Sequence, residues 1–250
     1  MLRLLTIILL ATQSIACDSN QAVRQFYYKY LDPPPTISLE ATKAPWQEVQ
    51  LSEAVLPIDQ KLTAITRFLA VYDKVGYDEW IRSLATRFPW IQGAAIISPD
   101  GAILFANPEG LFSNISLTPL TSVKTTGIKL QQKAMFYPVN TDDAFLFIGQ
   151  PVFTGEELVE YRVVAIALSA LSSFTPLAQK LYFIGNESVL WRGNETHTNS
   201  IAFTTNWKRK EYYTVSGLVK DRKSNTAIEY IIVYIGPVPF IIAIDVSKQE

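Results

Sequence analysis

Apolar positions recur along this chain with two different periods, and the change from one period to the other predicts its elements. The first period is helical: apolar residues three or four positions apart predict a helix over 57–75, with Pro57 at its first position and Gly76 after its end. A second apolar stripe from Trp80 to Phe88, stopped by Pro89, predicts a further helix. The first stripe consists of Ile58, Leu62, Ile65, Leu69 and Tyr72.

Strand-like runs begin after Trp90. Residues 94–97 and 102–106 flank Ser98-Pro99-Asp100-Gly101, in which proline at the second and glycine at the fourth position fit a type I turn. The stretch 107–133 has no strong period. Three strand-like runs follow at 133–139, 144–153 and 161–171, so we expect a hairpin, an insertion and a three-stranded meander.

The same order of elements returns later in the chain. A second hairpin is predicted over 183–191, followed by a polar loop over 193–206 and by strands at 210–219, 227–235 and 239–245. Few residues are identical between the two stretches, but the order of elements repeats. The simplest interpretation is internal duplication of one supersecondary unit.

The helix followed by the hairpin GAAIISPDGAILFANP (residues 93–108), an insertion and a meander resembles a Cache domain, the PAS-like extracytoplasmic sensor domain of bacterial receptors. The second copy makes the chain similar to the double-Cache arrangement. The resemblance implies an α+β fold: a long N-terminal helix, then a distal PAS-like module (52–175) and a proximal PAS-like module (176–250), each with an antiparallel sheet of about five strands. The roadblock and longin folds, which share the hairpin and meander, are the structural alternative.

The first 16 residues have the layout of a secretory signal peptide. Arg3 precedes an apolar run from Leu4 to Ala11, and small residues lead to Ala16. A run of eight residues is too short to span a bilayer, which needs about 20. Residues 17–51, interrupted by prolines 33–35, are expected to form an extended linker.

Ser14-Ile15-Ala16-Cys17 resembles a bacterial lipobox and contains the chain's single cysteine. The resemblance implies cleavage before Cys17, a diacylglycerol on its sulfur and a fatty acyl chain such as palmitate on its amine. Ser14 departs from the aliphatic residue that is usual there, so cleavage after Ala16 by ordinary signal peptidase stays open. We expect an exported protein of the cell envelope, attached by its lipid to the outer face of the inner membrane or to the outer membrane.

Composition argues against several classes of function. A net charge of −1 lacks the positive field of a nucleic-acid-binding protein. One cysteine and one histidine, His197, cannot form a Cys/His zinc site, and no nucleotide-binding glycine motif or G-x-S-x-G is present. We therefore expect no enzyme, no metal and no cofactor. A hydrolase that uses an unrecognised Ser-Lys or carboxylate site is the least favoured alternative.

The resemblance also implies where a ligand would bind: in the distal module, between the sheet and the 107–133 insertion. Residues 115–140 contain no Arg and no Trp, so the amino-acid motif of ligand-binding Cache domains is absent. Tyr137, Gln150 and Tyr161 are the candidate pocket residues. The expected function is a sensor or binding domain for a small molecule or an envelope protein partner. A structural or assembly lipoprotein with a filled core is the alternative.

Overall fold

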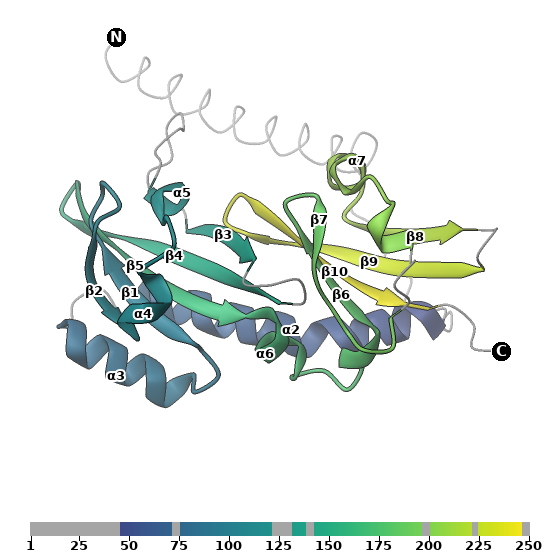
Figure 1. Cartoon of the computed structure of the whole chain (residues 1–250), viewed down its shortest axis with the longest axis horizontal. Helices are drawn as coiled ribbons and strands as arrows, with labels where there is room; N and C mark the ends of the chain where they lie inside the picture. Colours follow the sequence, from purple (N-terminus) through teal and green to yellow (C-terminus); the bar gives the residue numbers. More distant parts are fainter. Residues whose placement is uncertain are drawn as a thin grey trace, which may run out of the picture. The chain divides into compact units, whose positions relative to one another are not determined.

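Two antiparallel five-stranded sheets follow two helices in the computed structural model (Figure 1), which describes residues 46–71, 76–121, 132–138, 143–196, 201–221 and 225–246. The helices are α2 (Trp46–Val71) and α3 (Tyr77–Arg87). The distal module contains β1 (Gly93–Ile97), β2 (Ile103–Asn107), α4 (Glu109–Phe112), α5 (Thr118–Thr121), β3 (Lys133–Pro138), β4 (Ala144–Thr154) and β5 (Glu157–Ala167). The proximal module contains β6 (Leu181–Gly185), β7 (Ser188–Arg192), α7 (Trp207–Tyr213), β8 (Ser216–Asp221), β9 (Thr226–Ile235) and β10 (Val238–Asp245).

The two sheets have the same strand order, which confirms the expected α+β fold of two similar modules. The distal order is β2-β1-β5-β4-β3 and the proximal order is β7-β6-β10-β9-β8, with every neighbouring pair antiparallel. In each module the last strand lies in the middle, between the hairpin and the first two strands of the meander. A short helix α6 (Leu168–Ser172) and a 3-10 turn (Ala178–Lys180) connect the modules.

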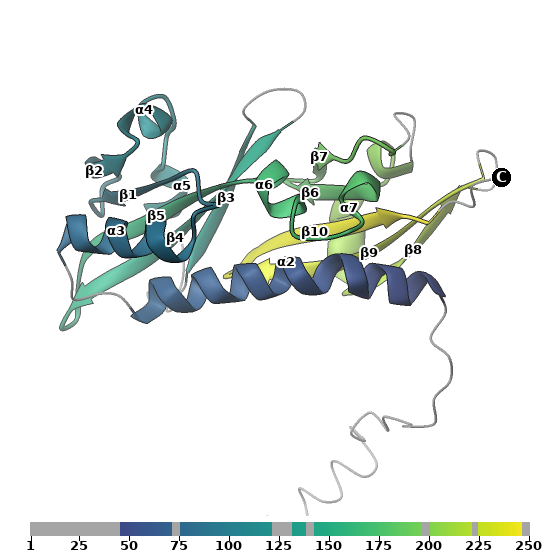
Figure 2. The ribbon, with the colours of Figure 1, turned by 90° about the horizontal axis from the view of Figure 1, so that it is seen from below.

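The long helix α2 packs against both modules. It contacts β4 of the distal sheet and β9 and β10 of the proximal sheet, and Figure 2 shows it running beneath both. It begins eleven residues before Pro57, so the expectation that Pro57 is its first residue is wrong. The reason is packing, because an apolar stripe in phase with Ile58 continues toward the N-terminus and is buried. These earlier residues are Leu51, Ala54 and Val55.

One hydrophobic core joins the two sheets on the side that faces α2 and α3. It includes Ile58 and Leu62 of α2, Trp80 of α3 and the inward residues of both sheets. Aromatic rings meet across the boundary: the ring centroids of Phe136 (β3) and Phe240 (β10) lie 5.5 Å apart. The modules therefore share buried apolar surface, and each sheet also has a smaller core on its outer face.

Two of the strands differ in their bounds from the sequence expectation. Residues 207–213 form helix α7, whereas a strand was predicted over 210–219; β8 begins only at Ser216. The side chain of Asn206 accepts a hydrogen bond from the backbone N–H of Arg209 (3.0 Å), which caps the helix. Similarly, β5 ends at Ala167 and α6 occupies the end of the run 161–171.

Candidate functional site

The insertion face of the distal sheet, defined here as the face covered by α4 and α5, is packed with apolar side chains. The rings of Phe112 (α4) and Phe147 (β4) meet edge to face with centroids 5.8 Å apart. Leu120 (α5) lies over Gly149, where an added Cβ would meet its side chain at 3.5 Å. The described part of the insertion therefore covers this face closely. The other buried members are Ala95, Ile97, Leu117, Tyr161, Val163 and Ala165.

Two polar side chains lie at one margin of the insertion face. The Nζ of Lys133 (β3) lies 5.5 Å from the ring centroid of Tyr161 (β5), and Tyr161 is only 2% exposed. Burial lowers the pKa of the Lys133 ammonium and raises the pKa of the Tyr161 phenol. The margin thus holds a half-buried cation and a buried phenol beside apolar surface, an arrangement suited to an anionic group with an apolar body.

The three residues expected to line a pocket do not meet at one place. Side chains alternate between the faces of a sheet, and Tyr137 and Tyr161 belong to the insertion face, whereas Gln150 lies opposite Arg162 on the face toward α3. Tyr137 pairs with Phe145 and Tyr161 with Pro151 on β4, six residues apart. At about 3.3 Å per residue, Tyr137 and Tyr161 are therefore about 20 Å apart along the strand direction. Tyr161 alone lies beside Lys133.

A buried ion pair lies on the opposite face of the distal sheet. Arg162 Nε donates to Glu160 Oε1 at 3.1 Å, and the hydroxyl of Tyr77 donates to Glu160 Oε2 at 2.7 Å. The guanidinium of Arg162 lies 5.3 Å from the ring centroid of Trp80. The hydrogen bond to Glu160 is the largest cause that raises the pKa of Tyr77. These contacts attach the first turn of α3 to β5.

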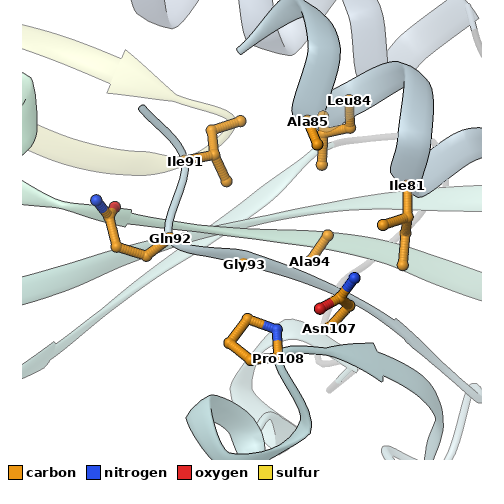
Figure 3. A pocket seen from close by; sticks show the side chains of 9 residues that line it. All are labelled: Ile81, Leu84, Ala85, Ile91, Gln92, Gly93, Ala94, Asn107 and Pro108. Carbon is orange, nitrogen blue, oxygen red and sulfur yellow. The ribbon is translucent and has the colours of Figure 1, made fainter. Parts of the chain in front are cut away.

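A small cleft opens between α3 and the end of the β1–β2 hairpin (Figure 3). It has a volume of about 160 Å³, and Gly93 and Ala94 form its floor. Asn107 and Pro108 form one wall and α3 the other, through Ile81, Leu84 and Ala85. The cleft belongs to the distal module, where a pocket was expected, but it lies beside α3 and not beneath α4 and α5. Sequence reasoning missed it because it depends on how α3 packs.

The face of the proximal sheet that corresponds to the insertion face is filled by Trp207 and Tyr230, whose ring centroids lie 5.5 Å apart. The indole of Trp207 donates to the carbonyl oxygen of Ala202 at 2.8 Å, and Tyr230 shares a 2.6 Å hydrogen bond with Thr214. Trp207 is therefore a packing residue of the core on this face. This face holds no site that compares with the Lys133–Tyr161 margin in the residues that the structure describes.

The other candidate groups have structural roles or lie outside the described residues. The carboxylate of Asp143 accepts from the backbone N–H groups of Ala144 and Ser169, which fixes the start of α6. Cys17 and His197 lie outside the described residues. Within the described ranges, no three His, Cys, Asp or Glu side chains are grouped as metal ligands, and no helix has the length and apolarity needed to span a membrane.

Comparisons with known proteins support the fold. No protein-family model matches the chain, and no curated protein matches it in sequence. Solved structures do match. An extracellular ligand-binding receptor from Desulfohalobium retbaense is 12% identical with a TM-score of 0.51, over 80% of this chain and 38% of that chain. The present chain therefore spans well under half of that receptor.

Two further structures are matched over most of their length. One is a domain of a putative sensory box/GGDEF family protein from Vibrio parahaemolyticus. It is 10% identical with a TM-score of 0.51, over 81% of this chain and 96% of that chain. The other is the ligand-binding domain of the Pseudomonas aeruginosa amino-acid chemoreceptor PctB in complex with L-Arg. It is 12% identical with a TM-score of 0.51, over 81% of this chain and 92% of that chain. The chain thus has the double-module fold of extracellular sensor domains.

Proposed function

We propose that this chain is a sensor or binding domain that holds a small anionic molecule at the margin of the insertion face in its distal module. The observation that carries the proposal is the Lys133–Tyr161 pair, a half-buried ammonium 5.5 Å from the ring of a buried tyrosine. Binding sites are mostly apolar with a few well-placed polar groups, and this margin has that composition. The fold, shared with ligand-binding receptor domains, supports the same class of function.

The proposed ligand carries a carboxylate or a similar small anion for the ammonium of Lys133. Bringing an anion beside a partly desolvated ammonium favours the charged lysine, so binding and protonation support each other. Tyr161 contributes its phenol to the same ligand group. Tyr137 lies on the same face but about 20 Å away along β4, and Gln150 faces α3, so we assign neither to direct contact with this ligand.

The test is a thermal-shift screen of the chain that begins at Asp18 against small carboxylates, phosphates and neutral analogues. A ligand that binds only the folded state raises the melting temperature with its concentration. Lys133→Met and Tyr161→Phe should abolish or strongly reduce the shift, whereas Lys220→Met, at an exposed position of edge strand β8, should leave it unchanged. A shift that survives both substitutions would refute the assignment.

A structural or assembly role is the second candidate function, and the filled insertion faces of both sheets favour it. Phe112, Leu117 and Leu120 cover the distal face, and Trp207 and Tyr230 fill the proximal one. If no anion in the screen stabilises the protein at any concentration, this second function is preferred. The protein would then act through its surface, on an envelope partner.

We also propose that the protein is exported and attached to a membrane of the cell envelope by a lipid on Cys17. The support is the apolar run at 4–11, the small residues that follow it, and the position of the single cysteine directly after them. Two lipid signals suffice for stable anchoring, so a cysteine acylated on both sulfur and amine would hold the protein firmly. Residues 17–45 then connect the lipid to the start of α2.

A further inference from the structure

The outer edge of β2 differs from the other edges of the two sheets. The four edge strands are β2, β3, β7 and β8. β3 carries Lys133 and Pro138, β7 carries Arg192, and β8 carries Lys220 and Asp221, whereas β2 (ILFAN) has neither charge nor proline. Charged residues and proline on an edge strand discourage pairing with another chain. Among these described edges, β2 alone lacks that protection.

The side chains of β2 are also unusually exposed. Ile103 is 41% and Leu104 52% exposed, although both are large and apolar. Leu104 lies at an irregularity in the pairing with β1, where Ile97 pairs with Ile103 and Ile96 with Phe105. Within the described residues no strand pairs with β2 on its outer side. The strand therefore offers backbone N–H and C=O groups next to apolar surface.

The cleft of Figure 3 lies at the C-terminal end of the same strand. Asn107 is the last residue of β2 and pairs with Ala94, so the cleft floor and the strand edge are neighbours. A strand added outside β2 would lie about 4.8 Å from it and would point alternate side chains toward α3. One such side chain, placed beside Asn107, would reach the apolar walls formed by Ile81 and Ala85. A pocket next to a free edge is the arrangement that gives strand addition its specificity.

The charges around β2 indicate which kind of segment would pair with it. Asp100 precedes the strand and Glu109 follows it, and both are exposed. No lysine, arginine or histidine occurs between Arg87 and Lys124. Antiparallel pairing of β2 with a second copy, centred on Phe105, would bring Asp100 of one chain beside Glu109 of the other. Like charges disfavour that pair, whereas basic residues at both ends of a partner strand would complement it.

We propose that β2 is a docking site for an extended segment of a partner protein, which adds a strand to the distal sheet by β-augmentation. The segment has alternating apolar residues, one of which occupies the cleft between α3 and Asn107, and has lysine or arginine at both ends. The backbone hydrogen bonds supply affinity, the cleft selects an apolar anchor, and Asp100 and Glu109 select the basic flanks. This surface is separate from the Lys133–Tyr161 margin, because the cleft lies beside α3 and not beneath α4 and α5.

The proposal is tested with two labelled peptides and the chain that begins at Asp18. Both peptides have the same alternating Thr-Val centre; one has paired lysines at each end and the other paired glutamates. Fluorescence anisotropy should show that the lysine peptide binds at least about tenfold more tightly than the glutamate peptide, a difference that shrinks as salt screens the charges. Glu109→Gln should weaken binding of the lysine peptide.

Two substitutions separate the strand edge from the cleft. Leu104→Lys places a charge on the exposed edge and should weaken binding of the lysine peptide at least about tenfold. Ala85→Phe fills the cleft from its exposed wall and should have a similar effect, whereas Thr86→Phe, on the same helix but outside the cleft, should bind as the wild type does. Circular dichroism of each variant checks that the fold is kept, since all three positions are exposed.

The outcomes that overturn the proposal are specific. Equal affinity for the two peptides would exclude the charge selection. Absence of binding, or binding that Leu104→Lys and Ala85→Phe leave intact, would exclude the site. Sedimentation that shows a dimer of the chain, lost in Leu104→Lys, would mean that β2 pairs with a second copy and that no partner segment is involved.

Discussion

Gly185 of β6 lies directly against the ring of Phe136 of β3, so that a Cβ on Gly185 would be 2.7 Å from two ring carbons. The ring of Phe136 also packs against Phe240, so it cannot move without disturbing the boundary between the modules. The absence of a side chain at Gly185 therefore sets how closely the two sheets approach.

Gly185→Ala should destabilise the folded protein because the new methyl group overlaps a ring that is held on several sides. Overpacking of this kind costs about 1–3 kcal/mol in the free energy of unfolding. Gly110→Ala is the matched control, since an added Cβ there meets no atom within 4 Å. Chemical denaturation of both variants measures the difference. Equal stability of the two would show that the modules can separate without cost.

Gly236 and Gly155 allow backbone strain to be separated from steric overlap. Both have positive φ, +59° and +63°, which L side chains adopt at a cost of about 1 kcal/mol. A Cβ on Gly155 meets nothing within 4 Å, whereas one on Gly236 would lie 1.9 Å from the carbonyl oxygen of Gln132. We expect Gly155→Ala to lower the free energy of unfolding slightly and Gly236→Ala to lower it much more. Similar losses would mean that Gln132 can move aside.

The buried ion pair should contribute far more to stability than an exposed one. Arg162→Met leaves the carboxylate of Glu160 buried without its guanidinium, and breaking such a pair costs about 3–5 kcal/mol. Lys208→Met removes a pair with Glu187 of similar length, 3.0 Å, in which both side chains are exposed. That change should cost at most about 1 kcal/mol. Urea unfolding of both variants tests the contrast, and equal losses would contradict it.

Glu229 should make stability depend on pH. Burial, and secondarily the charge of Glu48, raise its pKa. A carboxyl whose pKa is raised in the folded state opposes folding once it ionises, so the free energy of unfolding falls as pH rises through the folded-state pKa. Glu229→Gln should remove this fall, so the variant should be more stable than the wild type at neutral pH. The difference in the free energy of unfolding should vanish below the ordinary glutamate pKa of about 4.3. The exposed substitution Glu79→Gln controls for the loss of one charge. An advantage independent of pH would refute this account.

Cys17→Ala should prevent lipid attachment. Metabolic labelling with a fatty-acid analogue should mark the wild type and not the variant, and the variant should either remain unprocessed or leave the membrane fraction. Ser14→Leu, which restores the usual lipobox residue, should keep or increase labelling. Labelling that persists in Cys17→Ala would refute the lipoprotein proposal.

The sequence by itself determined the elements and their duplication. The turn at Pro99 and Gly101 and the apolar runs on either side depend on local backbone preferences, so the first hairpin is where the pattern predicts it and the order of strands is as expected. Local signals failed where packing outweighed them. Pro57 lies inside α2 because the apolar stripe around it is buried, and residues 210–213 are helical although their pattern suggested a strand. The cap at Asn206 was the signal for that helix.

The site depended on the tertiary structure. Sequence could place Tyr137, Gln150 and Tyr161 on strands of the distal sheet, but it could not register those strands against one another. Register decides which face a side chain occupies and how far apart two residues lie, and it put Gln150 on the α3 face and Tyr137 far from Tyr161. The closeness of Lys133 to Tyr161 and the cleft beside Asn107 also arise only when separate elements pack, because no local pattern encodes a distance between residues remote in the chain.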